Sequence, residues 1–144
     1  MTHFHSLLFA AMFFMPQLSF AQTTPAIGGY SPVAYFTQGK PVLGDPAFAA
    51  SHDEKTYYFA SAEEVALFEE DPEKYAPRYP LCAFSLALGQ KMPLDPTNFQ
   101  IIGGHLLLFH RSDEVDGLFA FKESGLTDKE LVERADKSFK LITF

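Results

Sequence analysis

The sequence has no tryptophan, a single cysteine and few basic residues. Because Cys82 has no second cysteine to pair with, no disulfide can form within the chain, and the hydrophobic core must hold the fold. The 11 Lys and Arg residues against 18 Asp and Glu give a formal net charge of -7. This balance argues against nucleic acid or an anionic membrane surface as a partner, because both attract basic patches.

Motifs of the common enzyme classes are also missing. The chain has no glycine-rich phosphate loop, no Gly-x-Ser-x-Gly and no His-Glu-x-x-His, so phosphoryl transfer, acyl transfer and zinc hydrolysis have no support. No carboxylate stands at a defensible catalytic spacing from a His or Ser. We therefore predict no catalytic residue and favour a protein that is not an enzyme.

The residues that are present indicate one small packed domain behind a leader. The chain has 144 residues, of which 47% are hydrophobic, enough to bury a core. Residues 1–21 have the apolar run (Leu7–Phe14) and the small residues before Ala21 that are typical of a secretory signal peptide, although the first positions carry no Lys or Arg. A buried helix or an uncleaved anchor is the alternative. Cleavage predicts a periplasmic or secreted protein without a membrane span.

The most specific local pattern runs from a strand into a helix. Thr56–Phe59 are strand formers, and Ser61 with Glu64 three residues later is typical of a capping box at a helix start. Phe68 falls on the apolar face of this helix. Asp71–Pro72 then ends it and begins a second short helix, because proline is tolerated at the first helical position.

Two short hairpins are predicted. The first turns at Asp53–Glu54, which places Phe48 opposite Phe59 and leaves His52 exposed at the tip. The second joins strands 98–102 and 105–109 through a Gly-Gly turn. In this second hairpin, alternation places four apolar side chains on one face, which we expect to face the core: Phe99, Ile101, Leu106 and Leu108.

Helices and a linker complete the expected layout. Residues 22–28 are a flexible linker, 80–88 form a buried helix with Cys82 in its first turn, and a capping box at Thr127 opens a C-terminal helix at about 128–140. No internal repeat is evident in the sequence. The predicted fold class is α+β: a small single domain with two short β-hairpins, several short helices and a C-terminal helix.

Residues 29–110 resemble the YHS-domain family in its secreted branch, with residues 111–144 as an extension unlike the family. The resemblance rests on the order and spacing of several short motifs rather than on any one of them. These motifs are Gly29–Phe36, Gly39–Val42, Tyr57–Ser61, Asp71–Pro77, Cys82–Phe84 and Gly89–Lys91.

The resemblance implies a small α+β, YHS/TRASH-like fold, and many members of the family are linked to metal handling. Members that hold metal carry cysteines at the positions of Ala34, Ala60 and Glu64 in this chain. None of these three residues can supply a thiolate, so the resemblance implies a branch that lacks the metal-binding cysteines.

Other candidate ligands are few. Cys82 is either a nucleophile or metal ligand at a helix start, or an inert core residue. His52, His105 and His110 are the remaining candidates for a transition metal, and the last two point to opposite faces of a regular strand. An aromatic pocket is the further candidate, with Tyr30, Tyr35, Tyr57 and Tyr58 as its lining.

The expected function is therefore that of an exported YHS-domain binding module. It would hold a small ligand, a metal ion or a protein partner. The alternative is a thiol-dependent enzyme or redox protein that uses Cys82. The cofactor stays undetermined, with a transition metal as the candidate.

Overall fold

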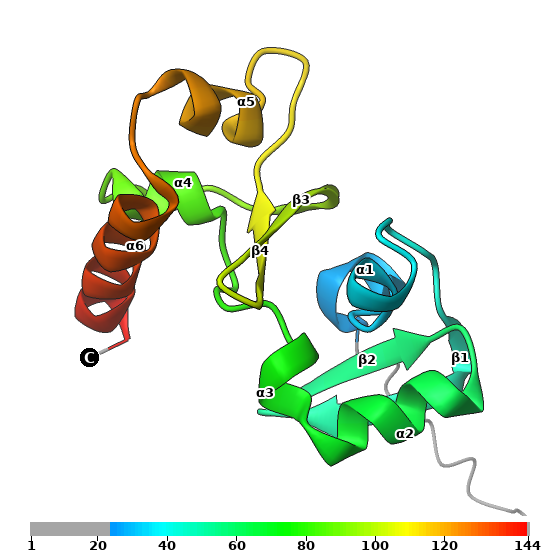
Figure 1. Ribbon diagram of the computed structural model, residues 1–144. Helices are drawn as coiled ribbons and strands as arrows, with labels where there is room; N and C mark the ends of the chain where they lie inside the picture. The colour runs from blue at the N-terminus through cyan, green and yellow to red at the C-terminus, as the bar shows by residue number, and fades with distance from the viewer. Residues whose placement is uncertain (1–23, 144) are drawn as a thin grey trace, which may run out of the picture.

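The computed structural model describes residues 24–143, so the predicted signal peptide and the first residues of the linker lie outside the described residues. The chain forms two antiparallel, two-stranded sheets, each with helices beside it (Figure 1). This arrangement confirms the predicted small α+β class with two hairpins.

The first half of the chain builds one hairpin unit. Its buried centre consists of aromatic and aliphatic side chains from the strands and the helices that follow them, including Phe59 and Phe68. The elements of this unit are α1 (Ala34–Thr37), β1 (Asp45–His52), β2 (Lys55–Phe59), α2 (Ala62–Glu70) and α3 (Pro72–Tyr75).

The second half builds another unit around its own core, in which Cys82, Phe109 and Phe121 are buried together with Leu131. The C-terminal helix packs on the helix that opens this unit, so residues beyond 110 complete its core. The elements of this unit are α4 (Ala83–Ala87), β3 (Asp95–Ile102), β4 (His105–Phe109), α5 (Gly117–Glu123) and α6 (Asp128–Ile142).

The two units share one plan. Each has a short helix, a hairpin and two helices in the same order, and the hairpins lie 50 residues apart along the chain. Both first strands begin with Asp-Pro, and both slip in register after it. Phe59 and Phe109 occupy equivalent ends and pack on Phe68 and Phe121 at ring distances of 5.0 and 6.1 Å. The expectation of no repeat is therefore wrong for the order of the elements. The repeat was not evident in the sequence because the two units have few identical residues.

A third cluster joins the two units. Tyr35 of α1 is buried with Leu106 and Leu108 of β4, and its ring meets Phe99 of β3 edge-on at 4.9 Å. Ile27 packs against this cluster from η1 (Ala26–Gly29). The predicted flexible linker is thus partly wrong, because its last residues form a packed helical turn whose apolar side chain has a core to join.

The first hairpin keeps its predicted turn but not all of its predicted register. Asp53 and Glu54 form the turn with positive φ angles of 48° and 61°, which non-glycine residues adopt at some cost. Asp45, and not Phe48, pairs with Phe59, because a bulge between Asp45 and Ala49 absorbs the intervening residues.

The second hairpin is buried on both faces, so the prediction of a single core face is wrong. Leu106 and Leu108 are fully buried as predicted, but Leu107 and Phe109 on the opposite face are also fully buried. This second face contributes to the core of the second unit, whose helices cover it. Ile101, predicted to face the core, is 36% exposed.

Helix starts follow the predicted caps with three differences. Ser61 accepts the Glu64 N–H as predicted, but the Glu64 carboxylate turns inward instead of closing the box. Cys82 is the residue before α4, not part of its first turn. Asp116 caps α5, a helix that the sequence left undefined. The box at Thr127 is present, and its helix α6 continues to Ile142 because the apolar stripe still packs there.

Candidate functional site

Two adjoining hollows form a cleft between the units. The apolar hollow, of about 540 Å³, is lined by Ile27, Leu94 and Pro96 among others. The polar hollow, of about 440 Å³, is lined by a set that includes His52 and His105. Both hollows share one wall, formed by Lys55, Tyr57, Pro77, Tyr79 and Pro80. A ligand in either hollow would therefore contact the same side chains.

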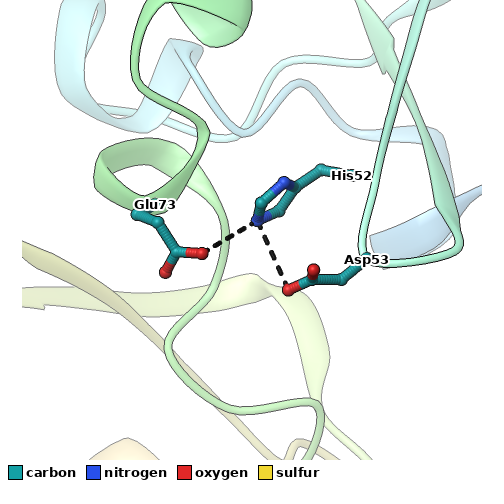
Figure 2. Close-up of side chains that lie close together, drawn as sticks. All are labelled: His52, Asp53 and Glu73. Atoms are coloured by element: carbon teal, nitrogen blue, oxygen red, sulfur yellow. Dashed lines mark hydrogen bonds and ion pairs between the residues drawn. The ribbon is translucent and has the colours of Figure 1, made fainter.

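Three potential metal ligands meet at the edge of the polar hollow. His52 ends β1, Asp53 begins the turn, and Glu73 lies in the first turn of α3 (Figure 2). The His52 Nε2 atom lies 3.1 Å from Glu73 Oε1 and 3.4 Å from Asp53 Oδ2. We call these three residues the triad.

The fold positions the triad by local means. The ring of Phe68 meets the His52 ring edge-on at 6.1 Å, which holds the imidazole against α2. Asp71 accepts the Lys74 N–H and starts α3, and this cap sets the direction of Glu73. The expectation that His52 is exposed is wrong, because its side chain is only 21% accessible under this aromatic contact.

The triad has the donors that a divalent cation needs. One ligand atom from each residue lies within 4.8 Å of the other two, a spacing that a single ion can bridge. Imidazole nitrogen with carboxylate oxygen suits zinc and its neighbours. The side chains of Asp53 and Glu73 are 77% and 82% exposed, so water can reach the same point.

Two buried tyrosines, Tyr57 and Tyr79, line both hollows. Tyr79 donates its hydroxyl proton to Asp136 at 2.7 Å, and burial is the main cause that raises its pKa. Burial likewise raises the pKa of Tyr57 to about 12, and the negative charges of Asp53 and Glu73 add to this effect. Both phenols are therefore protonated near neutral pH.

An ion pair closes the other side of the polar hollow. Arg78, in the segment between the units, donates from Nε and Nη2 to the two carboxylate oxygens of Asp136 at 3.1 and 2.9 Å. Burial opposes ionisation of Asp136, but the hydrogen bonds from Arg78 and Tyr79 outweigh it and keep the pKa of Asp136 below its ordinary value. These contacts fix α6 against the cleft.

The three candidate histidines do not gather in one place. His52 and His105 both line the polar hollow, from the tips of different hairpins. His110 lies after β4, where its Nδ1 atom is 2.9 Å from the carbonyl oxygen of Pro93. His105 therefore lines the polar hollow, and His110 does not.

Cys82 lies apart from the cleft. It is 1% exposed within the core of the second unit. Its sulfur stands so close to Gly117 that a Cβ on that glycine would come within 3.2 Å. This packing leaves no room for a substrate at the thiol and gives the thiol-dependent alternative no support.

The predicted aromatic pocket is only partly formed. Tyr57 lines both hollows, but Tyr30, Tyr35 and Tyr58 line neither of them. Tyr35 is 1% exposed, and its hydroxyl donates to the Pro96 carbonyl oxygen at 2.6 Å. Of the four tyrosines, Tyr57 is therefore the one that remains a candidate binding residue, and Tyr35 is a core residue.

Glu64 has a structural role in the first unit. The Glu64 side chain is buried, and its Oε2 atom accepts hydrogen bonds from Ser31 Oγ at 2.6 Å and from the Ala60 N–H at 2.8 Å. The carboxylate therefore ties α2 to the segment before α1. Glu64 is therefore a buried structural residue and not part of a solvated helix face.

Sequence reasoning missed Asp53, Glu73 and the Arg78–Asp136 pair as site residues. Asp53 was assigned to a turn and Glu73 to a helix start, and both assignments are correct. The available signal was that the hairpin tip carries His52 beside an acidic residue. Nothing in the sequence brings α3 to that tip, because the contact arises from the way the helix folds back.

Within residues 24–143, no helix is both long enough and apolar enough to cross a membrane. Comparisons of the chain with protein-family models, with curated proteins and with solved structures found no match. The site must therefore be interpreted from its own geometry.

Proposed function

We propose that the chain is an exported binding module of the YHS type that holds a divalent transition-metal ion at His52, Asp53 and Glu73. The observation that carries the proposal is the convergence of two carboxylates on the Nε2 atom of His52 within 3.4 Å. An ion at this point would replace one hydrogen bond and one ion-pair contact by three coordinate bonds. Little rearrangement of the fold is needed.

The donor set also suggests how the ion is held. Three protein ligands leave at least one position for water or a small ligand, as in open zinc sites. The exposed carboxylates make this an exchangeable site rather than a structural one. For such nitrogen and oxygen donors, Cu²⁺ should bind more tightly than Zn²⁺, and Zn²⁺ more tightly than Mn²⁺.

Calorimetric titration of the purified, chelator-treated protein with zinc chloride tests the proposal. We expect one zinc equivalent per chain, and at least about a tenfold loss of affinity in the variants His52→Ala and Glu73→Gln. Glu73→Gln keeps the shape of the side chain and removes its charge. Thermal unfolding of each variant shows whether the fold survives the change.

His110→Gln is the matched control. His110 is a half-buried histidine outside the cleft, so zinc affinity should be unchanged in this variant. If the unaltered protein binds no zinc, or if His52→Ala and Glu73→Gln bind it as well as the unaltered protein, the triad is only a clamp between hairpin and helix. Export is tested separately, by sequencing the mature N-terminus for a start at Gln22.

A further inference from the structure

The hydroxyl group of Tyr57 has no partner in the part of the chain that the structure describes. The Tyr57 side chain is 4% exposed and lines both hollows of the cleft. By contrast, the hydroxyls of the buried Tyr35 and Tyr79 each donate a hydrogen bond to a protein oxygen. The Tyr57 hydroxyl therefore keeps its donor free for water or a ligand.

The geometry explains where this hydroxyl points. Among the described residues, the fully enclosed side-chain atom without a partner is Oε1 of Gln100, so the Tyr57 hydroxyl is not fully enclosed. It reaches the open space of the cleft that Tyr57 lines. Since its pKa is raised to about 12, it is a hydrogen-bond donor at neutral pH.

The apolar hollow beside Tyr57 has the size and lining of a small-molecule site. Its volume of about 540 Å³ falls in the range of ligand pockets. Ile27, Leu94 and Pro96 supply an apolar lining from η1 and from the start of β3. A flat ring in this hollow would remove apolar surface from water on both the ligand and the protein.

The charge around the cleft favours a cation. Arg78 and Asp136 neutralise each other through two hydrogen bonds. The remaining charged residues of the lining are the carboxylates Asp53, Glu54 and Glu73 against the single ammonium of Lys55. The chain as a whole carries a formal charge of -7, which adds to the local excess of negative charge.

We infer that the cleft binds a small aromatic amine whose ring carries a hydrogen-bond acceptor. The ring occupies the apolar hollow, the acceptor receives a hydrogen bond from the Tyr57 hydroxyl, and the ammonium group lies among the carboxylates at the rim. This inference uses the hydroxyl and the apolar hollow rather than the imidazole of His52, but the ammonium group shares the carboxylates of Asp53 and Glu73 with the proposed metal ion, so the amine is tested on metal-free protein.

Three probes of one size test the inference by NMR titration of ¹⁵N-labelled, chelator-treated protein. Tyramine has the ring, the oxygen and the amine; phenethylamine lacks the oxygen; 4-hydroxyphenylacetate carries the opposite charge. We expect saturable shifts of the amides around Tyr57 and Tyr79 with tyramine, at a dissociation constant of about 1 mM. Phenethylamine should bind about fivefold more weakly, and the anion should not saturate.

Two isosteric variants locate the contact. Tyr57→Phe should weaken tyramine to the level of phenethylamine and leave phenethylamine unchanged. Tyr58→Phe is the control, since Tyr58 lies next to Tyr57 in β2 but lines neither hollow. The inference is overturned if tyramine gives no saturable shift, if 4-hydroxyphenylacetate binds as well as tyramine, or if Tyr57→Phe leaves tyramine affinity unchanged. The chelator keeps these outcomes separate from zinc binding.

Discussion

The two units have the same order of elements: a helix, two strands and two helices. In the first unit these are α1, β1, β2, α2 and α3, and in the second they are α4, β3, β4, α5 and α6. The two units nevertheless use their equivalent positions differently. At the hairpin tips, His52 and Asp53 of the first unit correspond to Ile102 and Gly103 of the second. The last helices of the two units, α3 and α6, have Glu73 and Lys129 as their second residues.

The second unit keeps a hollow at the equivalent place but has other residues at the three positions of the triad. Ile102, Gly103 and Lys129 all line a hollow of about 350 Å³. These three positions offer a metal ion nothing to bind. His105, Asp128 and Glu133 also line this hollow, but among the described residues only His52, Asp53 and Glu73 bring three ligand atoms within 4.8 Å of one another. The comparison teaches that the plan of the unit creates the hollow, whereas three side chains decide whether it can bind a cation.

The final helices of the units also differ. The helix α3 has 4 residues, and α6 has 15. The additional turns of α6 cover the core with Leu131 and Ala135 and carry Asp136 back to Arg78. The longer helix α6 thus covers the core of the second unit, whereas the shorter helix α3 leaves the triad of the first unit open to solvent.

The largest expected effect comes from Gly44→Ala. A Cβ at Gly44 would stand 2.5 Å from the backbone nitrogen of Phe59, whereas the equivalent position in the second unit is occupied by Leu94. Because the nearby atoms are backbone, the hairpin must shift, and we expect a loss of about 3 kcal/mol or more in the free energy of unfolding. Leu94→Ala should lower the free energy of unfolding by less than Gly44→Ala, and urea unfolding of both variants measures the two losses. Equal losses would contradict the steric difference between the two positions.

The next effect concerns the ion pair that only the longer helix can make. Asp136→Asn should lower the free energy of unfolding by about 2 kcal/mol at pH 7, since it removes a charged partner of Arg78 and Tyr79 that is only partly screened by water. The pKa of Asp136 is lowered in the folded state, so its stabilisation is complete above about pH 4 and is lost as the pH falls further.

Urea unfolding of the protein and of Asp136→Asn across this pH range checks that sign. The two stabilities should converge as the pH falls through the lowered pKa of Asp136 in the folded protein, because the carboxyl group is then protonated in both the folded and the unfolded state. A constant difference at every pH would mean that packing, and not charge, accounts for the loss.

Grafting the triad onto the second unit should change a free energy, that of zinc binding, by less than the two preceding variants change the free energy of unfolding. The combined variant Ile102→His, Gly103→Asp and Lys129→Glu recreates the donor set where a hollow already exists. Gly103 has a φ of 59°, close to the 48° of Asp53, so the aspartate can adopt the turn. We expect a second zinc equivalent in calorimetry, at least about tenfold tighter than any residual binding there, or about 1.4 kcal/mol.

The smallest expected effect compares the two helix caps. Thr127 and Glu130 cap α6 reciprocally, while Asp71 caps α3 with one hydrogen bond of 3.3 Å. Thr127→Ala should cost about 1 kcal/mol, and Asp71→Ala about half of that. Thermal unfolding of both variants checks the order, and a larger loss for Asp71→Ala would mean that α3 depends on its cap more than its length suggests.

Local signals in the sequence predicted the elements well. The Gly103–Gly104 turn fixed the second hairpin, and the caps at Ser61, Asp71 and Thr127 marked three helix starts. These signals succeed because a cap or a tight turn is decided by a few neighbouring residues. The bulge after Asp45 escaped prediction, because it depends on how the strand meets its partner.

By itself, the sequence determined the α+β class, the hairpin turns, the helix caps and the absence of an internal disulfide. Only the tertiary structure decided that two units repeat one plan, that Glu73 reaches His52 across 21 residues, and that Cys82 is enclosed. The physical reason is the range of the interactions. Turns and caps are made by residues close in the chain, whereas the cleft and the triad exist only where packed apolar faces bring distant segments together.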